Sequence, residues 1–201
     1  MYKNFRNKKG FTLIETLVSI LIVSIAVMAA TAALQSSLQT SSFVENQITA
    51  RYLAADAMEY ILALRDEGAA MSQGWMGKLL PCVSTGASAG SGEVWCSIDT
   101  YNNSMTSYTS ASDMSPLYVC SVPNGTNGTI SVFEQQNNTG CTATKFTRTV
   151  TIMPIQYLYP NDTNQFNEVI VTVKVSWANG PFSSSESYTL AEDIYNWQPS
   201  S

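Results

Sequence analysis

The chain has 201 residues, which is enough for one globular domain and an accessory segment. It contains no histidine, so the Ser-His-Asp and Cys-His catalytic arrangements and the common histidine-containing zinc sites are excluded. Its formal net charge is −5, and because an acidic chain repels phosphate groups we expect no direct binding to nucleic acid.

The basic residues are concentrated at the start of the chain. Four of the ten precede Phe11, and no acidic residue lies among them (Lys3, Arg6, Lys8, Lys9). The rest of the chain has 6 basic and 15 acidic side chains, a formal net charge of −9. An apolar run of about 24 residues follows the basic stub, from Phe11 to Leu34, and as a helix it would be about 36 Å long. Such a helix can span a bilayer, and the positive-inside rule places the stub in the cytoplasm.

Three interpretations of this segment compete. The small residues Ala30-Thr31-Ala32 resemble the cleavage site of a secretory signal peptide, but the apolar run is long for one. A plain single-span anchor accounts for the length. Neither interpretation explains Glu15, because a lone carboxylate in hydrocarbon costs about 2.5–3.5 kcal/mol and therefore needs a partner or a function.

The third interpretation gives Glu15 a partner. The string Gly10-Phe11-Thr12-Leu13-Ile14-Glu15 behind a basic leader resembles the cleavage and methylation motif of type IV prepilins and pseudopilins. The resemblance implies that a prepilin peptidase cuts the bond between Gly10 and Phe11 and that the new Phe11 amine is methylated. In a helical filament, the Glu15 carboxylate of one subunit can neutralise the Phe11 amine of another and so fix the register of the subunits.

A single long helix is predicted from Phe11 to Arg65, since this segment has neither proline nor glycine. Its first half is apolar all round, and Gly68 predicts its end. Its second half is amphipathic, with a stripe expected to pack on a globular domain and charged residues, Asp56 among them, on a solvated face. The stripe consists of Ile48, Tyr52, Leu53, Ala57, Tyr60, Ile61 and Leu64.

The four cysteines all lie downstream of the apolar run, without CxxC spacing (Cys82, Cys96, Cys120, Cys141). An even number in this position predicts two disulfides in an oxidising compartment, with four unrelated thiols as the alternative. Three connectivities are possible, and the sequence does not choose among them. We favour the sequential pairs, because each closes a short loop.

The region after the helix divides into two parts. Residues 68–145 are rich in Ser, Thr, Asn and Gly and predict loops around short apolar clusters. Residues 146–197 predict a β-sheet, because Phe146–Ile152 and Glu168–Trp177 alternate and Asn179-Gly180 marks a hairpin turn. We expect an α+β fold in which the long N-terminal helix packs on a small antiparallel sheet of three or four strands, with a disulfide-pinned, loop-rich insertion.

The expected organisation is a cytoplasmic leader peptide at residues 1–10, a transmembrane and filament-core helix at 11–34, its amphipathic continuation at 35–67 and an extracytoplasmic head at 68–201. Within the family that the motif resembles, many major pilins carry a proline in the apolar half, whereas this chain has Ala32 and Ala33 there. The run from Arg51 to Asp66 is similar to minor pilins related to the pilin-modification proteins and to I-type secretion pseudopilins.

These resemblances imply a structural subunit, a minor pilin, and not an enzyme. The implied partners are the prepilin peptidase and methylase, other pilin subunits, the inner membrane and the pilus assembly platform. The implied location is the cytoplasmic membrane, crossed once with the N-terminus inside, and then an extracytoplasmic or cell-surface filament. A pseudopilin of a type II secretion or DNA-uptake (competence) apparatus is the alternative, and a membrane-anchored binding domain ranks third.

Nothing in the head predicts catalysis. The acidic residues are scattered, without the paired spacing of general acid–base catalysts (Asp99, Asp113, Glu134, Asp162, Glu168). The segment 161–164 offers oxygen ligands for Ca²⁺, but a surface turn is the simpler interpretation because no second acidic cluster is near in sequence. We therefore expect no metal and no cofactor. Four aromatic residues are either part of an adhesive surface or packed in the core (Trp75, Trp95, Tyr101, Tyr108).

Overall fold

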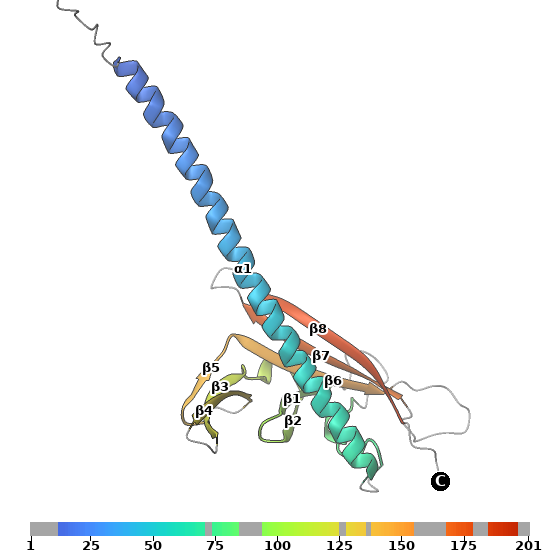
Figure 1. Ribbon diagram of the computed structural model, residues 1–201. Helices are drawn as coiled ribbons and strands as arrows, with labels where there is room; N and C mark the ends of the chain where they lie inside the picture. The colour runs from blue at the N-terminus through green and yellow to red at the C-terminus, as the bar shows by residue number, and fades with distance from the viewer. Residues whose placement is uncertain are drawn as a thin grey trace, which may run out of the picture. The chain divides into compact units, whose positions relative to one another are not determined.

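The computed structural model describes residues 12–70, 74–84, 94–124, 128–135, 138–154, 168–178 and 185–196. The chain forms two compact units, Met1–Glu45 and Asn46–Ser201, and a single helix, α1 (Leu13–Ala70), contributes residues to both (Figure 1). In the second unit this helix packs on antiparallel β-structure, which confirms the predicted α+β class.

The end of α1 differs from the sequence-based expectation. The sequence predicts that Gly68 terminates the helix, whereas the structure places it inside the last turn, buried. A Cβ at this position would lie 3.0 Å from the carbonyl oxygen of Gly74, which is tighter than nine in ten real Cβ contacts. Gly68 therefore lets the segment that follows the helix approach closely without displacing its backbone.

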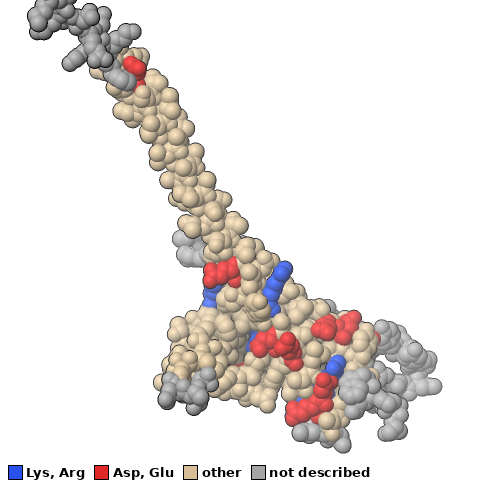
Figure 2. All heavy atoms as spheres, viewed as in Figure 1, with Lys and Arg blue, Asp and Glu red and all other residues tan. Residues whose placement is uncertain are grey.

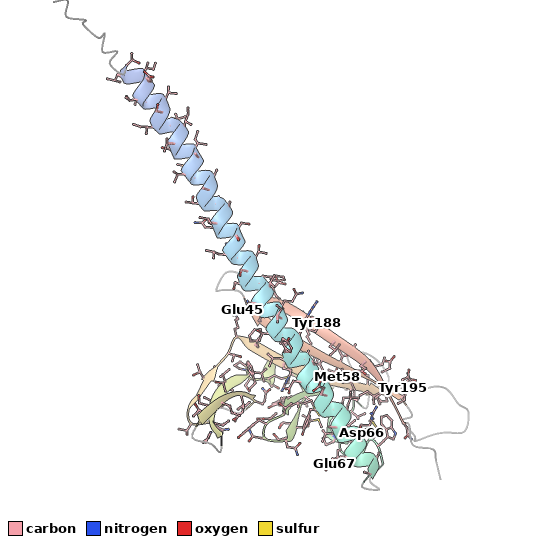
Figure 3. All side chains as sticks on the ribbon, in the orientation of Figure 1. Glu45, Met58, Asp66, Glu67, Tyr188 and Tyr195 are labelled. Carbon is pink, nitrogen blue, oxygen red and sulfur yellow. A yellow bond between two sulfur atoms is a disulfide. The ribbon has the colours of Figure 1, made fainter. Side chains whose placement is uncertain are left out.

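The buried face of α1 is only partly the same as the predicted stripe. Leu53, Ala57, Ile61 and Leu64 are buried, as predicted, together with residues that the stripe omits (Asn46, Ala50, Ala54, Met58). The prediction is wrong for Ile48 and Tyr52, which are 48% and 74% exposed. The alanines on the buried face let the helix lie close to the sheet, and the larger side chains at its margin stay outside. Figure 3 labels Met58 in the middle of this segment.

The main sheet has five antiparallel strands in the order β2-β1-β6-β7-β8, more than the three or four expected. Its strands are β1 (Trp95–Asp99), β2 (Ser104–Tyr108), β6 (Phe146–Pro154), β7 (Glu168–Ala178) and β8 (Ser185–Tyr195). The two additional strands, β1 and β2, come from the region that the sequence predicts to be loop-rich. The predicted turn at 179–180 lies outside the described residues.

The core lies between this sheet and the buried face of α1. On β7 the alternation is as predicted: Val169, Val171, Val173 and Val175 are fully buried, while Lys174 is exposed. The neighbouring strands add Ile98, Val150 and Ile152 to the same core.

A smaller sheet has three antiparallel strands in the order β4-β3-β5. These are β3 (Tyr118–Asn124), β4 (Gly128–Glu134) and β5 (Cys141–Ala143). Two short 3₁₀ helices, η1 (Leu80–Cys82) and η2 (Ala111–Asp113), complete the described elements. Leu117 ties the small sheet to the large one, because its backbone N–H donates to Phe146 O at 2.8 Å and its carbonyl accepts from Thr144 N at 2.8 Å.

Two disulfides pin these elements, in the sequential pairing that the sequence analysis favours. Cys82 is bonded to Cys96, which ties η1 to β1, and Cys120 is bonded to Cys141, which ties β3 to β5. Both bonds close short loops, with sequence separations of 14 and 21 residues. They therefore restrict the unfolded chain over the region with the least regular structure.

Removal of either disulfide should lower the free energy of unfolding by about 3 kcal/mol, the value expected for loops of this length. The variants are Cys82→Ser/Cys96→Ser and Cys120→Ser/Cys141→Ser, and urea unfolding of the full chain in detergent micelles measures the loss. The two pairs should cost about the same, because the longer loop of the second is offset by the full burial of both cysteines in the first. An unchanged unfolding midpoint in both variants would contradict this role.

Candidate functional site

The first part of α1 is an apolar surface that no described residue of its own unit covers. Every residue from 12 to 42 is exposed. An 18-residue window of the helix has a mean hydropathy of 2.6, and none of it is buried, so by length and composition the helix can cross a membrane, although a signal sequence passes the same test. Figure 2 shows this part of the helix almost without charged side chains.

Four hydroxyl groups of this segment are satisfied inside the helix. Thr16, Ser19 and Ser24 donate to the carbonyl oxygens of Leu13, Glu15 and Ile20 at 2.7–2.8 Å. Thr31 likewise donates to the carbonyl oxygens of the preceding turn. Because these donors already have acceptors, they add little cost when the helix is placed in hydrocarbon or among other helices.

Glu15 is the only charged residue between positions 12 and 44. It is exposed in the first turn of α1, where its backbone N–H donates to Thr12 O at 3.0 Å. The positive end of the helix dipole favours a carboxylate here. The dipole supplies only a partial charge, however, so it does not neutralise Glu15, and an external cation is still needed. The predicted cleavage and methylation positions, Gly10 and Phe11, lie outside the described residues.

A buried guanidinium connects α1 to the main sheet. Arg148 Nη1 on β6 donates to Leu53 O at 2.9 Å and to Asp56 Oδ2 at 2.8 Å, and Nη2 donates to Ile98 O at 2.6 Å. Burial lowers the pKa of Arg148 from its usual value, while the hydrogen bond and charge of Asp56 act in the opposite direction. Arginine nevertheless stays protonated at physiological pH, so the site is a charged structural bridge.

Asp56 therefore has a different role from the one that the sequence predicts. Its side chain is 48% exposed, as expected for a solvated helix face, but one oxygen pairs with the buried Arg148 and also accepts from Thr100 Oγ1 at 3.0 Å. The burial of Arg148 could have been predicted from the sequence, because Arg148 occupies an inward position in the alternation that includes Phe146 and Val150.

Two of the acidic residues that look scattered in the sequence meet in the structure. Asp99 and Glu134 are 2% and 3% exposed, and Asn102 Nδ2 donates to both, at 3.0 and 3.2 Å. Asp99 also accepts from the backbone N–H groups of Asn102 and Gln135, and Glu134 accepts from Asn138 Nδ2 at 2.7 Å. The sequence does not reveal this pairing, because β2, η2 and β3 separate the two residues along the chain.

The geometry of these groups favours a structural role. Among the described residues, the donors to both carboxylates are amide N–H groups, which satisfy their charge without a reactive neighbour. Cys120 and Cys141 lie with Glu134 within 4.8 Å, but both sulfurs belong to one disulfide and offer no thiolate to a metal. The segment 161–164, considered above for Ca²⁺, lies outside the described residues.

The four aromatic residues divide between core and surface. Trp75 is buried, and Trp95 and Tyr108 are half-buried, as expected for packing residues. Tyr101, in the turn after β1, is 50% exposed. The last turns of α1 carry ordinary surface pairs, Arg65 with Asp66 and Glu67 with Lys78, and Figure 3 labels Asp66 and Glu67 there.

Comparison with known families matches the start of the chain. The family model of the prokaryotic N-terminal methylation motif matches residues 5–31, which include the string from Gly10 to Glu15. No curated protein and no solved structure matches the chain. This chain thus carries the N-terminal methylation motif of prepilins followed by a long apolar helix, a combination consistent with the type IV pilin family.

Proposed function

We propose that this chain is a minor pilin of a type IV pilus. A prepilin peptidase removes residues 1–10, and the Phe11 amine is methylated. The apolar helix at 11–34 first holds the protein in the cytoplasmic membrane and then packs among other pilin helices, while residues 68–201 form the extracytoplasmic head. The match of residues 5–31 to the methylation motif supports this function, since that motif implies processing by the peptidase and assembly with other pilins.

The observation that carries the proposal is the uncovered apolar first part of α1. Its large hydrophobic side chains are exposed along the whole segment, and a surface of this kind does not stay in water. Lipid can cover it before assembly and other apolar helices can cover it afterwards. The lone carboxylate of Glu15 fits the second environment only if a cation from another subunit reaches it.

Two features favour a minor rather than a major subunit. The helix runs without a break through Ala32 and Ala33, where many major pilins have a proline. The run Arg51–Asp66 is also similar to minor pilins related to the pilin-modification proteins. The I-type secretion pseudopilins share that similarity, so a pseudopilin of a secretion or DNA-uptake apparatus is the second candidate. Recovery of the chain in filaments sheared from the cell surface would favour the pilus, and retention in the envelope would favour the pseudopilin.

We infer a structural rather than an enzymatic activity. The methylation motif belongs to a family of structural subunits. Asp99 and Glu134, the two carboxylates that share the Asn102 amide, are buried among amide donors, where no substrate reaches them. The function of the protein is then to assemble into the filament and to present the head outside the cell.

The first test is the exact mass and N-terminal sequence of the unreduced protein from the cell that produces it. We expect a chain that begins at Phe11, is heavier by about 14 Da for each N-methyl group and is lighter by about 4 Da because of two disulfides. The control is Gly10→Val, which should retain residues 1–10 because a branched side chain beside the scissile bond obstructs the peptidase. A chain that begins near Ala33 would indicate an ordinary signal peptide, and an uncut wild-type chain would indicate a plain anchor.

A further inference from the structure

The unit formed by residues 46–201 contains a groove that filament assembly does not explain. Its volume is about 660 Å³, and it lies between α1, the turn that follows β1, and β4. Tyr52 from the helix, Tyr101 from the turn and Phe133 from β4 line it. Tyr52 and Tyr101 are 74% and 50% exposed, so two aromatic side chains are available to a partner.

The groove is also acidic. Asp56 and Glu59, one turn apart on α1, line it, and no lysine or arginine is among its lining residues in the described part of the chain. Glu59 is exposed and has no hydrogen bond or ion pair with any described residue. Its charge is therefore free to act on a ligand.

Two buried charged residues next to the groove are also acidic, like Asp56 and Glu59. Asp99 directly precedes Thr100 of the groove, and Glu134 directly follows Phe133; both carboxylates are buried and bonded to amide donors. Asp99 is close enough to raise the pKa of Tyr60, after the larger effect of burial. In the described part of the chain, the one cation that pairs with these four carboxylates is the Arg148 guanidinium, which is already bonded to Asp56. Complementarity of charge thus calls for a cation.

The groove is held in shape before any ligand arrives. Asp56 Oδ2 accepts from Arg148 Nη1 at 2.8 Å and from Thr100 Oγ1 at 3.0 Å, which joins the helix wall to the turn that carries Tyr101. Arg148 Nη1 also bonds the carbonyl oxygen of Leu53 in the same wall. A partner therefore meets a rigid site and loses little affinity to the ordering of its walls.

We infer that this groove binds arginine or lysine side chains from a basic segment of a partner protein. The tyrosine rings offer faces to a guanidinium or ammonium group, and Glu59 offers a charged acceptor beside them. The partner's basic segment is also attracted by the overall charge, because acidic residues outnumber basic ones in the chain after Phe11. Such binding is separate from filament assembly and does not depend on it.

The test is a titration of the full-length protein, in nonionic detergent micelles at low salt, with an amidated Gly-Arg-Gly-Arg-Gly peptide that carries the fluorescent label on its N-terminus. The same peptide with serine in place of arginine is the control for the label and the backbone. Two independent variants alter the groove, Glu59→Gln and Tyr101→Leu. Glu192→Gln is the matched control, because Glu192 is an exposed acid on β8 outside the groove. All three positions are exposed, so urea unfolding should stay unchanged.

We expect the arginine peptide to bind and the serine peptide not to bind. Each groove variant should weaken binding about three- to fivefold, the size of one exposed cation–π contact or charge pair, and Glu192→Gln should leave it within about 1.5-fold. Three results would overturn the inference: no binding of the arginine peptide, equal weakening by all three variants, or displacement of the peptide by Ca²⁺ at micromolar concentration, which would assign the groove to a metal.

Discussion

The Glu15→Leu variant should be processed and inserted into the membrane like the wild type, yet its incorporation into filaments should fall by more than about tenfold. The apolar substitution makes residues 11–34 more hydrophobic, so membrane insertion does not suffer. In the filament, however, the Phe11 amine of a neighbouring subunit would be left without its counter-ion in a low-dielectric core, which costs several kcal/mol. Comparison of the sheared filament fraction with the membrane fraction measures the effect.

Ser24→Ala is the matched control for that experiment. Ser24 lies in the same apolar segment, and its hydroxyl donates only to Ile20 O within its own helix at 2.8 Å. Its replacement removes a polar group without removing a charge, and incorporation should stay within about twofold of the wild type. If Glu15→Leu assembled as well as Ser24→Ala, with both chains beginning at Phe11, the proposed pairing of Glu15 with the amine would be wrong.

The parts of the fold that the sequence predicts well are those in which one periodicity persists over many residues. The absence of proline and glycine from Phe11 to Arg65 predicts α1, and strict alternation predicts β7. In each case the local preference and the burial pattern agree, so tertiary contacts do not have to override either.

The sequence predicts the fold less well where a residue's secondary structure or burial depends on contacts with residues distant in the chain. β2 (Ser104–Tyr108) is mostly polar and too short to show an alternation, and it forms because β1 lies beside it. Hydrophobicity alone places Tyr52 on the buried stripe, but small alanines define the buried face and leave Tyr52 outside. Gly68 looks like a terminator, and its actual role depends on the Gly74 carbonyl six residues later.

The site residues show the same division. The string from Gly10 to Glu15 is a local motif, and the sequence alone is sufficient to find it. The groove needs α1, the turn after β1, and β4, which are far apart in the chain, and nothing in the spacing of Glu59 and Tyr101 indicates that they line one surface. The acidic pair Asp99 and Glu134 is hidden for the same reason.

Arg148→Ala should lower the free energy of unfolding by about 3–5 kcal/mol. The guanidinium is 1% exposed and bonds the carbonyl oxygens of Leu53 and Ile98 as well as Asp56, so one side chain holds the helix, β1 and β6 together. Truncation removes all of these bonds and leaves a cavity beneath the helix. Urea unfolding of the full chain in detergent micelles gives the loss, read from the midpoint at an unchanged slope.

Arg65→Ala is the control for that variant, because it also removes an arginine that pairs with an aspartate of α1. Arg65 and Asp66 are 21% and 54% exposed, and water can replace their contact, so the loss should stay below about 1 kcal/mol. The difference between the two variants measures what burial and the backbone hydrogen bonds of Arg148 add to an ordinary surface ion pair. If Arg148→Ala cost no more than Arg65→Ala, the buried guanidinium would not be what fastens α1 to the sheet, and the apolar buried face of the helix would do so instead.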